Sequence, residues 1–416
     1  MSPHILFVII IVILVISQLF DFFLDYLNLS TRKHPIPKVL EDVYNDKEYA
    51  KQQAYEIEIT RFSFLNSLVS FVAILLVLFF DGFAYLDNYI RLYISNEILI
   101  SLLFFGVLML LSSILSLPFS IYSTFVIEEK YGFNKTTPKT FFFDLIKGAL
   151  LSVLLGGILL YVVILLYQLF GSYFWVMAWG VVTIFSVFMN MFYSQLIVPL
   201  FNKQTPLENG KLRDLIEEFS QKAGFKLNNI FVIDGSKRSS KANAYFSGLG
   251  PKKRIVLYDT LIKDLKEEEI VAVLAHEVGH YKHKHTIKGL ISSIIQTGFI
   301  LFVFSLLIDN PVLNLALGAE HQSFHFGLIV FSFLFSPISL FIGIFTSYFS
   351  RKNEYQADAF AKAYGYAEHL VSGLKQLSRN SLSNLTPHSF YVFVHYLHPT
   401  LFQRMKALAL WKEKNN

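Results

Sequence analysis

The sequence contains no cysteine among its 416 residues. A disulfide framework, a thiol nucleophile and a cysteine-based zinc site are therefore excluded. Charge is also scarce, since Asp, Glu, Lys and Arg make up 16% of the chain against 54% hydrophobic residues, 43 of them phenylalanine. An ordinary soluble domain carries more charge and fewer apolar residues. The composition indicates a membrane protein, in which any metal site must use histidines and carboxylates.

Seven apolar stretches carry no charge in their central turns, and each approaches the roughly 20 residues that a helix needs to cross a bilayer. They cover residues 5–20, 62–80, 98–120, 148–170, 174–201, 289–308 and 326–350. The first has no basic leader, and Asp21 and Asp25 follow it in place of a small-residue cleavage site. We interpret it as a retained span and not as a signal peptide. The sequence thus predicts a mainly α protein with seven transmembrane helices.

Basic residues fall unevenly on the two sides of the predicted membrane. Of the 36 Lys and Arg residues, 6, 4, 15 and 9 lie in segments 28–61, 121–147, 202–286 and 351–416. Only Arg91 lies on the opposite side, and Lys288 stands at the mouth of the sixth span. Loops rich in Lys and Arg face the cytosol. The C-terminus is therefore expected in the cytosol, and the N-terminus outside the cell or in a lumen.

These signals divide the chain into four parts. Spans one to five with their cytosolic loops take residues 1–201, a cytosolic unit takes 202–286, spans six and seven take 287–350, and a cytosolic C-terminal region takes 351–416. The unit 202–286 has the pattern of a small α/β fold, with an amphipathic helix at Leu212–Ala223 and strands at Ile230–Ile233 and Arg254–Tyr258. A further helix follows, which Thr260 or Asp264 is expected to cap and which runs on through Ala275.

That helix continues into His276-Glu277-Val278-Gly279-His280, an H-E-x-x-H pattern. Two histidines four residues apart share one face of a helix, so both imidazoles can bind one zinc ion. Glu277 then projects beside the open coordination position, where it can act as general base towards zinc-activated water. The pattern also arises by chance on helices whose histidines are merely solvated. By itself it favours a zinc peptidase without proving one.

A zinc protease needs a third protein ligand, and the candidate is Glu354 in the segment 353–358, directly after the last span. Asp358 shares the helical face of Glu354 and can orient a ligand histidine from behind. The alternative is an ordinary pair of surface carboxylates. We predict metal binding by His276, His280 and Glu354, with Asp358 in support.

The ligands also lie close to the membrane. His280 precedes Gly289 by nine residues and Glu354 follows Ser350 by four, which at 1.5 Å per residue is about 14 Å and 6 Å from a span. Because the metal must work on water, the spans are expected to enclose a wet cavity beside it. The predicted fold is a seven-helix membrane protein enclosing a cavity, with a small cytosolic α/β zinc-metalloprotease domain.

In the order and spacing of its motifs the chain resembles the type I CAAX prenyl proteases, which are seven-span membrane zinc metalloproteases. The matching segments are 127–135, 237–240, 243–246, 253–261, 276–280 and 353–358, and then His398 and Pro399 followed by Arg404. The resemblance implies one Zn²⁺ per chain, catalysis by Glu277, a site lined by His398 and Arg404, and contact of Asn243 with the peptide backbone. Lys241 differs, because a histidine is common at that position in the family.

The resemblance further implies cleavage near the C-terminus of prenylated CAAX-type substrates or other flexible C-terminal peptides. It implies a monomer in contact with membrane lipid and with no nucleic-acid partner, in the endoplasmic reticulum membrane if eukaryotic and the cytoplasmic membrane if bacterial. Three alternatives remain open: a broad-specificity quality-control zinc protease of the membrane, a transporter with a chance motif, and a non-catalytic scaffold. Transporters usually place ionisable residues inside their spans, and a scaffold would not need Glu277.

Overall fold

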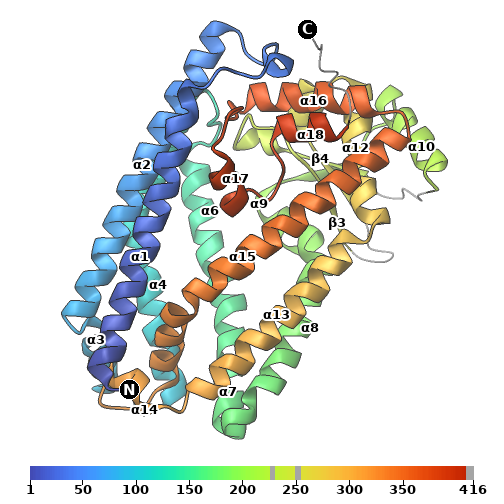
Figure 1. Ribbon diagram of the computed structural model, residues 1–416. Helices are drawn as coiled ribbons and strands as arrows, with labels where there is room; N and C mark the ends of the chain where they lie inside the picture. Colours follow the sequence, from blue (N-terminus) through green and yellow to red (C-terminus); the bar gives the residue numbers. More distant parts are fainter. Residues whose placement is uncertain (225–229, 249–253, 409–416) are drawn as a thin grey trace.

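The computed structural model describes residues 1–224, 230–248 and 254–408. Long helices form the lower part of the molecule in Figure 1, and shorter helices with a small sheet form the upper part. The N-terminus lies at the bottom, and α18 (Leu401–Ala407), the last described helix, lies at the top. The chain is mainly helical, as predicted, and its small α/β unit sits at one end of the long helices.

Six helical segments among the described residues are long and apolar enough to cross a membrane. Five of them contain α1 (Pro3–Ser30), α2 (Asp46–Phe79), α4 (Glu97–Tyr122), α13 (His285–Leu307) and α15 (Phe324–Ala363). Only 6–22% of the most apolar window of each segment is buried in the protein. Such helices need an apolar solvent around them, so the chain is a multi-pass membrane protein.

The remaining segment, 138–201, contains both stretches that we predicted as the fourth and fifth spans. It runs through α6 (Pro138–Leu151), η4 (Ser152–Gly157), α7 (Ile158–Phe170), η5 (Gly171–Tyr173), α8 (Phe174–Leu196) and α9 (Val198–Phe201). Gly171 turns the chain with φ 55°, which a residue with a side chain rarely adopts. At the other end, Lys147 Nζ donates to the carbonyl of Leu200 at 2.8 Å. The two ends of the segment therefore lie together.

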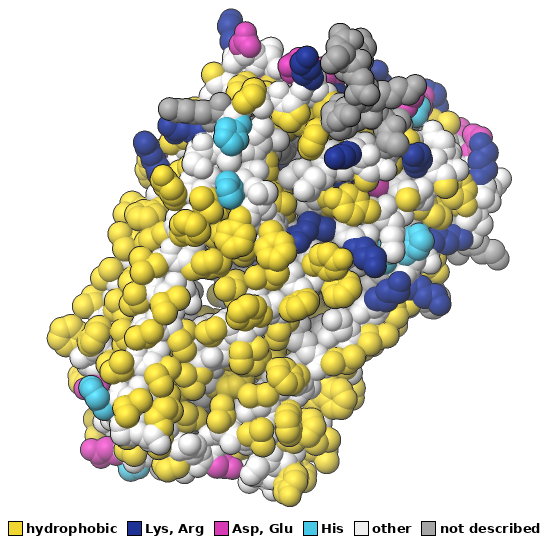
Figure 2. Space-filling model, viewed as in Figure 1, with side chains coloured by type: hydrophobic (Ala, Val, Ile, Leu, Met, Phe, Trp, Pro, Cys, Tyr) yellow, Lys and Arg dark blue, Asp and Glu magenta, His cyan; other side chains and the backbone are white. Residues whose placement is uncertain are grey.

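Short elements join the long helices. They are η1 (Thr31–Lys33), η2 (Lys38–Leu40), α3 (Gly82–Arg91), η3 (Ser123–Glu128), α5 (Glu129–Tyr131) and α14 (Pro311–Leu315). Arg91, which we expect on the side opposite to most of the basic residues, pairs with Asp87 at 2.8 Å and Glu97 at 2.6 Å. Figure 2 shows the contrast between the two ends, with hydrophobic side chains over the lower part and Lys and Arg gathered over the upper part.

The sheet has four strands in the order β1-β2-β4-β3. They are β1 (Gln204–Pro206), β2 (Ile230–Ile233), β3 (Ala244–Ser247) and β4 (Arg254–Tyr258), and only β2 and β4 pair in parallel. The predicted strands at β2 and β4 are confirmed. Strands β1 and β3 were not predicted, because β1 has three residues and β3 shows no alternation of burial. Strand β4 is paired on both sides, with β2 and with β3. The edge of the described sheet next to Asn243 is therefore formed by β3.

Helices pack around this sheet to form the upper part. They are α10 (Lys211–Lys222), η6 (Gly235–Lys237), α11 (Asp259–Asp264), α12 (Glu267–Lys282), α16 (Ala367–Asn380), α17 (Ser389–His395) and α18 (Leu401–Ala407). The predicted cap of α12 was wrong, because Thr260 and Asp264 belong to α11 and Lys266 is the N-cap. There the Lys266 N–H donates to Glu269 Oε2 at 2.9 Å. The carboxylate of Glu269 in the first turn thus accepts a hydrogen bond from a backbone N–H group that has no partner within the helix.

Candidate metal centre

Helices α12 and α15 bring three metal-ligating side chains together. His276 Nε2 and His280 Nε2 lie 3.1 Å apart, and Glu354 Oε2 and Oε1 lie 3.4 Å and 3.2 Å from them, respectively. A zinc ion with bonds of about 2.0–2.2 Å in a tetrahedron holds its ligand atoms about 3.3–3.6 Å apart. The triangle formed by these side chains therefore fits such an ion, and the three residues are those that we predicted.

Two further properties of the site suit a cation. Glu354 Oε2 is buried, and although nitrogen atoms of His276, His398 and Arg404 lie within 4 Å of it, none of them forms a well-aligned hydrogen bond with it. A bound cation would satisfy this oxygen directly. Burial disfavours the charged form of His276, yet hydrogen bonds to Asp358 and Glu354 raise the pKa of His276 to about 9. A site that stabilises a proton this strongly has the negative potential that a metal ion requires.

A buried ion pair holds His276 from behind. Asp358 Oδ1 lies 2.8 Å from His276 Nδ1, so the ring presents Nε2 to the metal position. Arg404 of α18 donates two hydrogen bonds to the same carboxylate, from Nε at 2.9 Å and from Nη2 at 2.5 Å. Only Arg404 Nη1 is directed towards Glu354, at 3.8 Å from Oε2. The guanidinium thus contacts mainly the carboxylate behind the histidine, and Nη2 also lies 3.2 Å from His276 Nδ1.

His280 has a supporting chain that the sequence did not reveal. His285 Nδ1 lies 3.0 Å from His280 Nδ1, and His285 Nε2 lies 2.9 Å from Gln356 Oε1. If His285 donates from Nε2 to the amide oxygen, its Nδ1 accepts from His280 Nδ1, which leaves His280 Nε2 free for the metal. His285 thus fixes the orientation of the His280 ring. Nothing local in the sequence indicated this contact, because His285 begins a new helix after the break at Lys284.

Glu277 lies between the two histidines in the sequence, and no described residue forms a hydrogen bond with its carboxylate. Burial raises the pKa of Glu277, with a smaller raising effect from Glu354, while the two neighbouring histidines oppose the shift. A carboxylate with a raised pKa accepts and returns a proton more easily near neutral pH. The group is thus free to hold a water molecule and suited to move its proton.

Gly279 allows α12 to approach α15 closely enough for the three ligands to meet. A Cβ built on it would stand 3.0 Å from Ala357 Cα and 3.0 Å from Phe360 Cβ. We expect Gly279→Ala to destabilise the protein by about 1–3 kcal/mol and to lower turnover, because the added methyl group pushes Glu354 away from the histidines. Thermal unfolding and zinc content measure both effects.

The matched control is Gly289→Ala on α13, where a Cβ would meet nothing within 4 Å. Alanine favours a helix over glycine, so this variant should unfold at or above the temperature of the original protein. Equal behaviour of the two variants would show that the close approach at Gly279 is unimportant.

His398 contacts a candidate ligand directly, whereas Asn243 lies next to the sheet. His398 Nδ1 is 3.0 Å from Glu354 Oε2, and its side chain is 68% exposed. It lines a cavity of about 610 Å³ that Arg404 also reaches. Asn243 immediately precedes β3, and its Oδ1 accepts from the Ala244 N–H at 2.9 Å. Of these two predicted residues, the structure brings His398 to the ligands and Asn243 to the free edge of the sheet.

Lys241, which departs from the family pattern, ties the sheet to the membrane helices. Its Nζ lies 3.0 Å from Glu128 Oε2 and 3.2 Å from Tyr55 Oη, and it stands 4.3 Å above the ring of Phe133. The segment 127–135 therefore packs against the unit that contains the sheet. In this arrangement Lys241 is a structural residue and no part of the metal centre.

Two family models match the chain almost end to end. Residues 25–203 match the CAAX prenyl protease N-terminal model, described as five membrane helices, and residues 206–412 match peptidase family M48. The second match contains all three candidate ligands and Glu277.

Curated relatives and a solved structure agree with these matches. The chain is 38% identical to the CAAX prenyl protease 1 homolog of Arabidopsis thaliana over 95% of both chains. It is 35% identical to the CAAX prenyl protease 1 homolog of Homo sapiens, over 91% of this chain and 89% of that one. The crystal structure of S. mikatae Ste24p superposes with a TM-score of 0.90 at 34% identity, covering 97% of this chain and 98% of that one.

Proposed function

This chain belongs to the CAAX prenyl protease group of peptidase family M48, and on that basis we propose that it cuts prenylated proteins near their C-terminus at the centre formed by His276, His280 and Glu354. It is a membrane metalloendopeptidase. The observation that carries the assignment of the centre is the convergence of these three side chains beside a carboxylate, Glu277, that binds no other described residue. No feature of the site favours a transporter or an idle scaffold.

The metal in this proposal is one zinc ion per chain. Two imidazoles and one carboxylate, with no thiolate available, are the ligand set of many catalytic zinc sites. When bound, zinc acts as a Lewis acid that makes water a nucleophile at neutral pH and polarises the carbonyl to be attacked. Asp358 and His285 orient the two ligand rings, so the chain itself sets the tautomers that binding requires.

Glu277 moves the proton in both halves of the reaction. Its carboxylate takes a proton from the attacking water and later returns it to the nitrogen of the leaving amine. The raised pKa of Glu277 supports this double role, because it makes the carboxylate a better proton acceptor in the first half, while the carboxylic acid can still protonate the more basic amine nitrogen in the second.

We assign different roles to His398 and Arg404. His398 is exposed beside Glu354, where an N–H can meet the oxygen on which negative charge develops. Arg404 acts through Asp358 on His276 and is a positioning residue. Both are expected to matter for turnover, and they should differ in their effect on the metal.

His398→Ala should lower kcat by roughly 10², the loss usual for a single oxyanion donor, with zinc content unchanged. Arg404→Ala should lower turnover to a similar extent and also weaken zinc binding about 10- to 100-fold, because it loosens the partner of a ligand. Steady-state kinetics together with zinc titration separate the two. An unchanged rate in His398→Ala with zinc retained would make His398 an ordinary surface histidine.

The substrate is proposed to bind as an extended segment along β3. This strand is the outer strand of the described four-stranded sheet, α12 packs beside it, and the ring of Phe246 on β3 lies 5.4 Å from that of Tyr281 on α12. Backbone hydrogen bonds to a strand edge hold a peptide with little regard to its sequence. Asn243 at the start of β3 is well placed to add a contact to the peptide backbone.

We also propose seven crossings with a cytosolic C-terminus. The segment 138–201 turns at Gly171 and returns to Lys147, which supports two crossings within it. The N-terminus and α18, the last described helix, lie at opposite ends of the molecule, which supports an odd number (Figure 1). The metal centre lies on the side rich in Lys and Arg, which supports a cytosolic active site. In a eukaryotic cell this orientation fits the endoplasmic reticulum membrane.

The proposal is tested with purified protein, a farnesylated C-terminal peptide and its unprenylated twin, with products identified by mass spectrometry. We expect cleavage near the C-terminus, faster for the farnesylated peptide. The same sequence placed inside a folded domain should resist cleavage, because the site is expected to face a cavity enclosed by the spans. Equal rates for the two peptides and the folded domain would instead favour a quality-control protease with an open site.

A further inference from the structure

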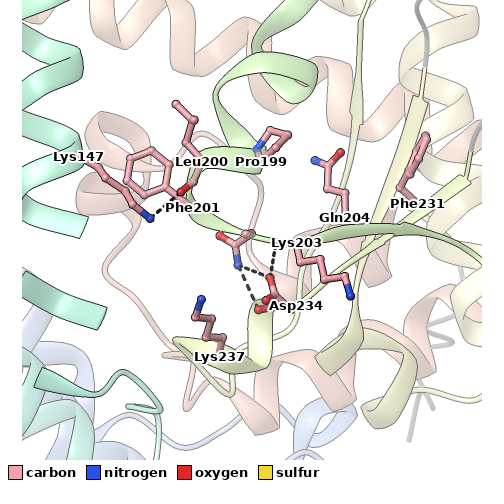
Figure 3. A pocket seen from close by; sticks show the side chains of 10 residues that line it. Lys147, Pro199, Leu200, Phe201, Lys203, Gln204, Phe231, Asp234 and Lys237 are labelled. Atoms are coloured by element: carbon pink, nitrogen blue, oxygen red, sulfur yellow. Dashed lines mark hydrogen bonds between the residues drawn. The ribbon is translucent and has the colours of Figure 1, made fainter. Parts of the chain in front are cut away.

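A pocket lined by lysines lies at the edge of the sheet opposite to the metal centre (Figure 3). It has a volume of about 540 Å³, and we call it the lysine pocket after Lys147, Lys203 and Lys237. It opens beside β1 and β2, whereas β3 at the other edge lies next to α12. Nothing in the reaction proposed above uses this pocket, so its function is a separate question.

The lysine pocket carries an excess of positive charge. Lys147 donates to the carbonyl of Leu200, and no described carboxylate pairs with Lys203 or Lys237. Asp234 is the single acidic residue in the lining, and its Oδ1 already accepts from Asn202 Nδ2 at 3.0 Å and from the Lys203 N–H at 2.8 Å. In Figure 3, Lys147 and Lys237 reach into the pocket from different walls. Three ammonium groups around one cavity attract an anion.

The lysine pocket also lies at the level of the membrane surface. Lys147 is the last charged residue before the two apolar stretches of segment 138–201, and Lys203 is the first charged residue after them. Because both line one pocket, they mark the depth at which the chain enters and leaves the hydrocarbon. Lysines at that depth on the cytosolic side meet lipid headgroups.

The remaining walls are apolar. Pro199, Leu200 and Phe201 at the end of the membrane segment form one wall, and Phe231 of β2 forms another. A free inorganic anion gains no free energy from contact with apolar walls, whereas the glycerol and upper acyl carbons of a lipid are stabilised by burial against them. A lipid-binding site combines cationic and apolar walls at the depth of the headgroups, and the lysine pocket has both.

We propose that the lysine pocket binds the phosphate of an anionic glycerophospholipid through Lys147, Lys203 and Lys237. A dissolved phosphate shares this chemistry and differs in lacking the glycerol and acyl part. The lipid stands at the foot of the sheet, where it holds the cytosolic unit against the bilayer. The site requires no metal and is independent of proteolysis.

The test measures binding of dioctanoyl phosphatidic acid to the full-length protein in a neutral detergent, by native mass spectrometry. Dioctanoyl phosphatidylcholine and inorganic phosphate are the comparison ligands. A lysine near an anionic headgroup contributes roughly a fivefold gain in affinity, so Lys203→Ala with Lys237→Ala should weaken phosphatidic acid binding about 30-fold. Lys203→Arg with Lys237→Arg keeps both charges and should retain binding within about threefold.

The matched control is Lys47→Ala with Lys263→Ala, which removes two exposed cations from the same side of the protein. It should bind phosphatidic acid as the original protein does, and all variants should cleave peptide and unfold normally in lipid-free detergent. Equal affinity for phosphate and phosphatidic acid would overturn the lipid assignment. Unchanged binding in the alanine pair, or an equal loss in the control pair, would overturn the site itself.

Discussion

Glu277→Gln should retain its zinc and lose proteolysis, with kcat falling by about 10³-fold, within the range that general acid–base groups contribute. The amide has nearly the shape of the carboxylate and cannot take a proton from water. Glu277 forms no hydrogen bond with a described residue, so its replacement leaves no partner unsatisfied, and the fold should be unaffected. Peptide cleavage and zinc analysis of the same preparation separate the loss of the base from a loss of metal.

The control for this variant is Glu268→Gln, on the exposed start of the same helix. Its side chain is 44% exposed and lies 3.5 Å from Lys211 Nζ, an exposed ion pair of the kind that contributes little to stability. Turnover should remain near that of the original protein. Substantial activity in Glu277→Gln would transfer the role of base to another residue.

Removal of the ligands should have the second large effect. Combined replacement of His276, His280 and Glu354 by alanine should abolish zinc binding and reduce cleavage to background, because no other metal-ligating cluster exists among the described residues. Glu354→Ala alone should lower zinc affinity and activity together, since two imidazoles remain. Zinc per chain, measured by elemental analysis of protein purified without added metal, reports both results.

His369→Ala provides the comparison for these ligand variants, since it removes an exposed histidine from α16 on the same side of the membrane. It should keep one zinc per chain and normal turnover. Persistence of one zinc in the triple variant would place the metal elsewhere.

The sequence alone was sufficient to predict those parts of the site whose residues share one face of a helix. His276 and His280 share a helix face because 3.6 residues make a turn, and Glu354 and Asp358 share one for the same reason. Strands β2 and β4 were predicted within their true bounds because they are short runs of apolar residues between polar ones. These features depend on local periodicity, which a single sequence records.

The remainder depends on pairing between distant segments, which periodicity does not record. Arg404 meets Asp358 across 46 residues, and His285 meets Gln356 across 71. Strand β3, which forms the edge of the described sheet, was not predicted because its four residues show no alternating pattern that would identify a strand. Each of these contacts becomes visible only when α12, α15 and α18 are packed together.

The central claim is that one zinc ion stands between α12 and α15 in reach of Glu277. The most direct measurement is an anomalous difference map from crystals of Glu277→Gln protein, with data collected on both sides of the zinc absorption edge. We predict a single peak about 2.0–2.2 Å from His276 Nε2, His280 Nε2 and the carboxylate of Glu354. A map with no peak at this position, or with its peak on other residues, would contradict the assignment of the metal centre.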